Sequence, residues 1–125
     1  MNEKILCIED NPDNMMLIRR VTQARGYHLI EAQTGADGLS LAQDQEIKLI
    51  LLDINLPDID GYEIARRLRT DLNHRESKIP IIAITANALI GDAEKVLDAG
   101  CDVYMAKPIN IHELWARLDF FLPQS

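Results

Sequence analysis

Residues 48–57, KLILLDINLP, carry the strongest structural signal in the chain. Four consecutive apolar residues, 49–52, show no alternation with polar ones, which is typical of a strand covered on both faces, as in a parallel sheet. The apolar run ends at Asp53, whose side chain is a carboxylate. The stretch therefore predicts a buried parallel strand with an acidic residue at its carboxyl end.

Short apolar runs with stretches of helical period between them extend this pattern over the whole chain. Strands are expected at residues 4–8, 28–31, 48–52, 79–84 and 102–105. Gly26 ends the first helix, Gly38 weakens the second by about 1 kcal/mol relative to Ala, and the last opens at Asn110 with Glu113 and ends before Pro123. Five βα units in strict alternation predict an α/β fold, with right-handed crossovers and helices on both faces of a parallel sheet.

The composition limits the class of protein. The chain has 125 residues, 47% of them apolar, which fits a single domain over residues 1–125 with a packed core. It lacks a signal peptide and an apolar run of roughly 20 residues, so a cytoplasmic location without membrane contact is expected. Twenty acidic residues against 13 basic ones give a net charge of -7, which excludes non-specific nucleic-acid binding. Two cysteines, Cys7 and Cys101, form neither a CxxC motif nor a disulfide framework.

Charged and hydroxyl side chains follow four of the five expected strands. Glu9 and Asp10 follow the first strand, Asp53 the third, Thr85 the fourth and Lys107 the fifth. Ligand sites of open α/β sheets lie beyond the carboxyl ends of the strands, so these groups are expected to converge. Clustered carboxylates need a neutralising cation, and hard oxygen ligands suit Mg²⁺. Asp53 could then attack phosphorus as a nucleophile, while Lys107 and Thr85 stabilise the phosphoryl oxygens.

Each of these residues also has a local structural interpretation. Asp10 or Asn11 before Pro12 can cap a helix, and a strand-end residue such as Asp53 often belongs to a turn. The segment Asp10-Asn11-Pro12 can both cap a helix and contribute to a metal site. The joint occurrence of these groups at successive strand ends favours a functional site, because capping does not predict it.

As a set, these motifs resemble the receiver domain of two-component response regulators, over essentially the whole chain. The matching segments are Glu9-Asp10, residues 51–57 followed by Asp60-Gly61, residues 84–86 and Lys107-Pro108. The resemblance implies a flavodoxin-like doubly wound (βα)5 fold with strand order 2-1-3-4-5.

The resemblance further implies a phosphoacceptor and a metal site. Asp53 would take a phosphoryl group from a phosphohistidine on a sensor histidine kinase or a histidine phosphotransfer protein. Mg²⁺ (or Mn²⁺) would be held by Asp10, Asp53 and the backbone carbonyl of Asn55, with Glu9 reaching the ion through water. Asn55 and Asn87 occupy positions that tune the lifetime of the acyl phosphate.

The remaining matched residues imply a switch. Lys107 would bind the phosphoryl group, with a cis peptide bond to Pro108. The hydroxyl of Thr85 would move toward the phosphoryl group and the ring of Tyr104 would turn inward. The surface formed by the fourth helix, the fifth strand and the last helix, about residues 88–121, would then bind a downstream protein.

The protein is accordingly expected to be a phosphoacceptor switch that takes part in its own phosphorylation and dephosphorylation, and not an enzyme. With no output domain, its signal would leave by protein contact, from a monomer or weak dimer. The alternative is a small aspartate-nucleophile phosphohydrolase, although such enzymes usually have a second acid where this chain has Asn55. A flavodoxin-type cofactor binder fits less well, because residues 9–14 are too acidic to hold a flavin phosphate.

Overall fold

The expected alternation of strands and helices is confirmed by the computed structural model, which describes residues 3–72, 78–86 and 90–123. The elements are β1 (Lys4–Ile8), α1 (Pro12–Ala24), β2 (His28–Ala32), α2 (Gly35–Leu41), β3 (Ile47–Asp53), α3 (Gly61–Leu72), β4 (Ile81–Thr85), α4 (Ile90–Asp98), β5 (Val103–Ala106) and α5 (Ile111–Phe121). β4 begins later than the expected residue 79, directly after Pro80, which has no N–H to donate to a ladder. None of the described helices is long and apolar enough to cross a membrane.

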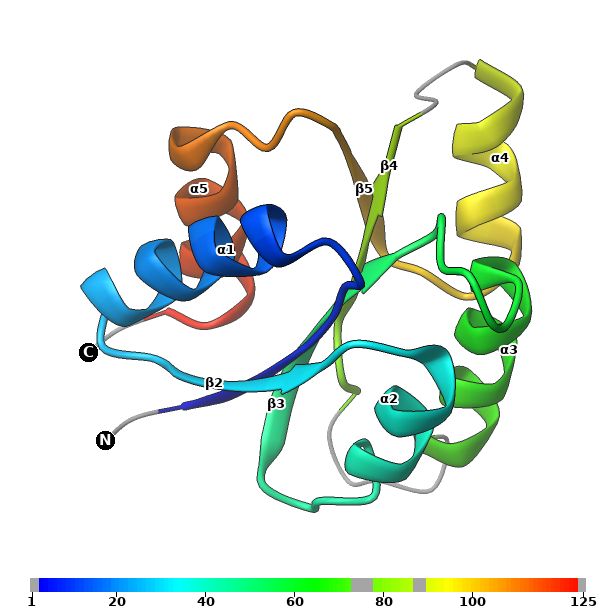
Figure 1. Ribbon diagram of the computed structural model, residues 1–125, viewed down its shortest axis with the longest axis horizontal. Coiled ribbons are helices and arrows are strands. Elements are labelled where there is room, and N and C mark those ends of the chain that lie inside the picture. The colour runs from blue at the N-terminus through cyan, green and yellow to red at the C-terminus, as the bar shows by residue number, and fades with distance from the viewer. Residues whose placement is uncertain (1–2, 73–77, 87–89, 124–125) are drawn as a thin grey trace.

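The five strands form one parallel sheet in the order β2-β1-β3-β4-β5, as the resemblance implied. In Figure 1, α1 and α5 cover one face, and α2, α3 and α4 cover the other. Alternate strand residues feed two apolar clusters, one on each face. The central strand β3 is buried at every position except Lys48, which explains its unbroken apolar sequence. Since all strands run in parallel, their carboxyl ends share one edge.

Side-chain caps fix where the helices begin. At α1, the residue that caps the helix is different from the acidic residue expected to bind the metal. The carboxamide oxygen of Asn11 accepts hydrogen bonds from the N–H groups of Asp13 (2.9 Å) and Asn14 (3.1 Å), with Pro12 in the first helical turn. Asn11, and not Asp10, is therefore the cap of α1, which leaves the Asp10 carboxylate available at the sheet edge. Asn110 caps α5 in the expected way, because its side chain accepts from the Glu113 N–H at 2.9 Å.

Two glycines allow close packing near this edge. A Cβ atom at Gly38 would lie 2.4 Å from Cδ1 of Ile8, so the expectation that this glycine merely weakens α2 was incomplete: it lets α2 approach the end of β1. A Cβ atom at Gly61 would lie 2.4 Å from the carbonyl oxygen of Ile54. The start of α3 therefore packs directly on the backbone that follows β3.

The opposite edge of the sheet is held by the guanidinium of Arg69 in α3. It donates to the carbonyl oxygen of Gly100 from Nε (3.0 Å) and Nη2 (2.8 Å), to that of Ile79 (3.1 Å) and to Oδ2 of Asp102 (2.9 Å). Oδ2 of Asp102 also accepts from the N–H of Ile81 at 2.8 Å. Arg69 thus joins α3 to the segments that enter β4 and β5.

Candidate functional site

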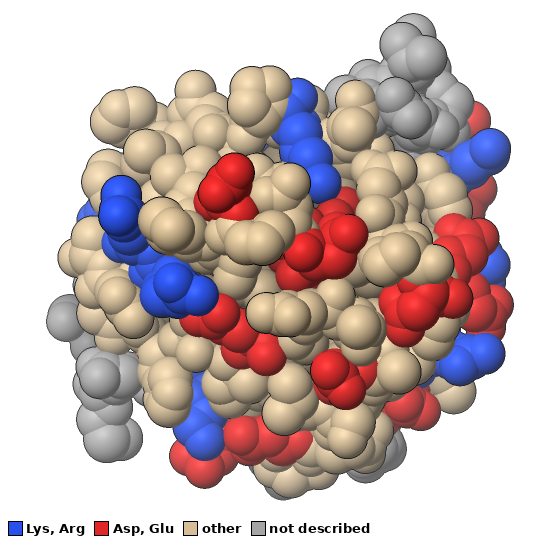
Figure 2. Space-filling view, in the orientation of Figure 1, with Lys and Arg blue, Asp and Glu red and all other residues tan. Residues whose placement is uncertain are grey.

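The carboxyl ends of β1, β3 and β5 bring two carboxylates and one ammonium together, as predicted. Nζ of Lys107 lies 3.2 Å from Oδ2 of Asp53 and 3.6 Å from Oε1 of Glu9. Each of the three residues follows, by two positions, a buried residue of the α1/α5 face, so strand alternation turns all three side chains the same way. The peptide bond between Lys107 and Pro108 is cis, as expected. Acidic side chains are spread over the centre and right of the molecular face in Figure 2.

The donor set of this site fits a hard divalent cation. Glu9, Asp10 and Asp53 each offer one carboxylate oxygen within 4.8 Å of the others. Glu9 and Asp53 are each only 1% exposed, and Glu9 Oε1 and Asp53 Oδ2 have no hydrogen-bond partner among the described residues. Buried carboxylate oxygens without donors are costly, and a cation removes that cost. Oxygen ligands of this kind suit Mg²⁺.

The carboxyl group of Glu9 is difficult to ionise in this site. Its pKa is raised from 4.5 to about 7, first because burial penalises the charged form, and then because the Asp53 carboxyl group lies beside it. The N–H of Asn11, which donates to Oε2 at 3.1 Å, and the ammonium of Lys107 oppose this rise only partly. In the absence of a cation, the charge of Lys107 does not balance both carboxylates.

Hydrogen bonds order the loops around Asp53. Oδ1 of Asp53 accepts from the N–H of Asn55 at 2.9 Å, and Oδ1 of Asn55 accepts from the N–H of Ala86 at 3.2 Å. The N–H of Lys107 donates to the carbonyl oxygen of Thr85 at 2.9 Å. The side chain of Asn55 therefore connects the loop after β3 to the loop after β4, directly beside Thr85.

Thr85 and Tyr104, the expected switch pair, lie on the neighbouring strands β4 and β5. Tyr104 pairs with Ala83 in the ladder, so it faces the same side of the sheet as Thr85, two positions further along β4. Thr85 is 2% exposed, whereas Tyr104 is half-buried against the α2–α4 side of the core.

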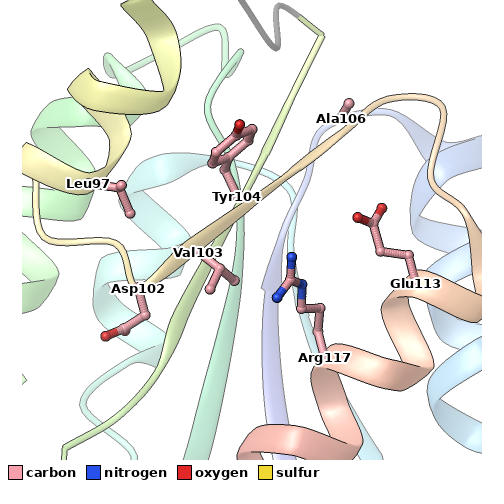
Figure 3. A pocket seen from close by; sticks show the side chains of 7 residues that line it. All are labelled: Leu97, Asp102, Val103, Tyr104, Ala106, Glu113 and Arg117. Carbon is pink, nitrogen blue, oxygen red and sulfur yellow. The ribbon is translucent and has the colours of Figure 1, made fainter. Parts of the chain in front are cut away.

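A groove of about 370 Å³ crosses the outer side of β5, between α4 and α5. Figure 3 shows Leu97 and Tyr104 on the α4 side, with Glu113 and Arg117 projecting from α5 toward the strand. The lining is completed by Asp102, Val103 and Ala106. This groove lies within the expected partner surface of about residues 88–121.

Asn87, and residues 88 and 89 at the start of that surface, lie outside the described residues.

The sequence did not predict the contact that Asp58 makes with α2. Its Oδ1 accepts from the N–H of Gly35 at 2.9 Å and its Oδ2 accepts from the N–H of Ala36 at 3.1 Å. The sequence Pro57-Asp58 is typical of an ordinary turn, and nothing in it points to residues 22 and 23 positions earlier.

Comparison with known proteins agrees with this geometry. The family model described as "Response regulator receiver domain" matches residues 5–119. The polar-differentiation response regulator DivK of Brucella ovis is 40% identical over 111 residues, which are 89% of each chain.

Two solved structures show the same fold. The receiver domain of sensor histidine kinase PA1611 from Pseudomonas aeruginosa has 36% identity and a TM-score of 0.85, over 99% of this chain and 100% of that one. That domain was crystallised with a magnesium ion coordinated in its active-site cleft. The receiver domain of Ssk1 from Saccharomyces cerevisiae has 26% identity and a TM-score of 0.88, over 96% and 88% of the chains, in complex with the histidine phosphotransfer protein Ypd1. The chain therefore belongs to the response regulator receiver domains of two-component systems, and it is a phosphoacceptor switch.

Proposed function

We propose that Asp53 is the phosphoacceptor and that the donor is a phosphohistidine on a kinase or histidine phosphotransfer protein. An oxygen of the Asp53 carboxylate attacks phosphorus and forms the P–O bond of an acyl phosphate. The P–N bond to the imidazole breaks, and its electron pair stays on the histidine nitrogen. The single observation that carries this assignment is the buried Oδ2 of Asp53, which has no hydrogen-bond donor among the described residues and lies 3.2 Å from the Lys107 ammonium. The complex of Ssk1 with Ypd1 supports the type of donor.

The residues suited to hold Mg²⁺, or Mn²⁺, are Asp10, Asp53 and the backbone carbonyl of Asn55, with Glu9 acting through a water molecule. The three carboxylates supply the hard oxygen ligands and the excess negative charge that such an ion requires. When bound, the ion would neutralise the carboxylates and the oxygens of an incoming phosphoryl group. The magnesium in the cleft of the PA1611 receiver domain supports this choice of metal.

Lys107 and Thr85 are the groups that would respond to the phosphoryl group. Conversion of a carboxylate to an acyl phosphate adds about one negative charge, which attracts the ammonium and a hydroxyl donor. Hydrogen bonds to charged groups contribute about 1.5 to 3 kcal/mol each, so two new ones bias the switch by about 3 to 6 kcal/mol. Reversing a 1:99 equilibrium takes about 5.5 kcal/mol, so a large shift toward the active state is expected.

The readout surface we propose is formed by α4, β5 and α5. Tyr104 lines the groove on that surface and faces the same side of the sheet as Thr85, so a movement of the Thr85 hydroxyl would make room for the tyrosine ring to turn inward. The altered groove would then bind a downstream protein. Asn55 and Asn87 would set how fast water reaches the acyl phosphate and thus how long the signal lasts.

The test is labelling with radioactive acetyl phosphate in the presence of Mg²⁺. We expect about one phosphoryl group per chain and none in Asp53→Asn. Asp60→Asn is the matched control, because Asp60 is an exposed carboxylate in the same loop. Its Oδ1 accepts a hydrogen bond from the N–H of Tyr62. Undiminished labelling of Asp53→Asn would overturn the assignment. Steady release of phosphate from a phosphomonoester would instead favour a phosphohydrolase.

A further inference from the structure

The side chain of Asp58 ties the loop between β3 and α3 to α2. Asp58 lies in the middle of this loop, three residues after Asn55, and its two carboxylate oxygens accept from two successive N–H groups of α2, those of Gly35 (2.9 Å) and Ala36 (3.1 Å). Pro57 and Asp58 are otherwise exposed. The bidentate contact therefore determines where this part of the loop lies relative to α2.

We propose that Asp58 is a positioning residue for the metal site: by holding the loop against α2, it sets the position of the Asn55 backbone carbonyl relative to the acidic pair. The proposal rests on the function proposed above, in which that carbonyl is a metal ligand. Asp58 itself touches neither the metal nor the phosphoryl group.

The same helix also contacts the strand that carries the acidic pair. At Gly38, α2 packs so closely on Ile8 that a Cβ atom would lie 2.4 Å from Cδ1 of that residue, and Ile8 directly precedes Glu9. At Gly35, a Cβ atom would lie 2.4 Å from Cδ1 of Ile64 in α3. Since α2 is fixed against both β1 and α3, it is a rigid support, and Asp58 connects the metal-binding loop to it.

The other ends of the loop have their own contacts. Near Asp53, the loop is held by the hydrogen bond from the Asn55 N–H to Asp53 and by that from the Ala86 N–H to the Asn55 side chain. At its far end, Gly61 packs on the backbone of Ile54. These contacts hold the two ends of the segment 55–60. In its middle, Leu56 and Ile59 pack against the apolar core, and Asp58 adds the polar contact with the N–H groups of α2.

The chemistry of the contact requires a carboxylate. Both partners are N–H donors at the positive end of a helix, so two acceptor oxygens are needed, and the pKa of Asp58 is lowered chiefly by the Gly35 N–H. Asn offers one acceptor oxygen and would turn its NH₂ group toward the second donor. Asp58→Asn should therefore be intermediate between the wild type and Asp58→Ala.

A matched pair of variants separates positioning from simple capping. Thr34 caps the same helix, since its hydroxyl oxygen accepts from the Asp37 N–H at 3.1 Å. Unlike Asp58, it is not a residue of the β3–α3 loop. Both Asp58→Ala and Thr34→Ala are expected to lower the melting temperature of the metal-free protein. Only Asp58→Ala should raise the dissociation constant for Mg²⁺ measured by calorimetry, by about tenfold, as for other residues that orient metal ligands. Thr34→Ala should stay within about twofold of the wild type.

A second measurement uses the wild type alone. Because coupling between two sites is reciprocal, Mg²⁺ should slow hydrogen exchange of the Gly35 and Ala36 amides by the same factor that Asp58→Ala loses in affinity. This test remains decisive if Asp58→Ala fails to fold, and Asp58→Asn then supplies the affinity comparison. Labelling by acetyl phosphate at saturating Mg²⁺ should be nearly normal in Asp58→Ala.

The outcomes distinguish the positioning role of Asp58 from the proposed function of the site. If the wild type binds Mg²⁺ and labels on Asp53, but Asp58→Ala and Thr34→Ala bind the ion equally well, the positioning role is wrong and the proposed function stands. Unchanged exchange of the Gly35 and Ala36 amides in Mg²⁺ would lead to the same conclusion. If the wild type does not bind Mg²⁺, both the proposed metal site and the role of Asp58 are wrong.

Discussion

Replacing Glu9 by Gln tests the electrostatic account of the site. Glu9 is 1% exposed, and its pKa is raised from 4.5 to about 7. The folded metal-free protein therefore holds this proton more tightly than the unfolded chain, so its stability falls as the pH rises between these two values. At 1.36 kcal/mol per pKa unit, the loss is at most about 3 kcal/mol and is complete above about pH 7. Gln keeps the shape of the side chain but has no charge to bury.

The free energy of unfolding should accordingly depend less on pH in Glu9→Gln. We expect the stability difference between the variant and the wild type, measured in urea with a chelator, to grow by up to about 3 kcal/mol in favour of the variant from about pH 5 to about pH 8. Fluorescence of Trp115, the single tryptophan, reports the unfolding. Saturating Mg²⁺ should stabilise the wild type more than the variant at the higher pH. Parallel pH profiles of the two proteins would refute the reasoning.

Three further substitutions test other parts of the structure. Lys107→Ala removes the ammonium 3.2 Å from Asp53 but none of the proposed metal ligands, so calorimetry should show that Mg²⁺ binding is retained. The shifts of the Thr85 NMR signals on phosphorylation should become smaller, and full shifts would show that Lys107 does not contact the phosphoryl group. Gly61→Ala places a Cβ atom 2.4 Å from the carbonyl oxygen of Ile54 and should destabilise the fold by about 1 to 3 kcal/mol in urea titrations, an unchanged midpoint being the contrary result. Arg69→Ala should cost about 2 to 4 kcal/mol of stability by the same measurement without weakening Mg²⁺ binding; an altered Mg²⁺ affinity would show that the two edges of the sheet are coupled.

Much of the site could be predicted because it depends on the direction and alternation of strands. Parallel strands place their carboxyl ends on one edge, and β1 and β3 are neighbours, so Glu9 and Asp53 converge once the order of the strands is known. The sequence left open whether Asp10 or Asn11 caps α1, because both residue types are common caps, and the structure assigns the cap to Asn11.

The contacts that could not be predicted depend on distances between elements. The role of Gly38 follows from how closely α2 approaches Ile8, a quantity that helix propensity does not contain. Asp58 binds backbone N–H groups 22 and 23 residues away, and Arg69 binds backbone carbonyl groups 10 and 31 residues away. Every residue has such backbone groups, so the sequence does not show which of them a side chain will bind. Periodicity detects which face of an element is apolar, but it does not detect which distant carbonyl or N–H a polar side chain reaches.

The contacts of Arg69 have a mechanical consequence for the switch. Four hydrogen bonds from one guanidinium join α3 to the segments that enter β4 and β5. The opposite ends of those two strands carry the Thr85 hydroxyl and the Lys107 ammonium, which a phosphoryl group would rearrange. Because the guanidinium of Arg69 anchors the amino ends, α4 and β5 should rotate about a fixed pivot near Gly100. Displacements on phosphorylation would then increase along α4 with distance from that residue.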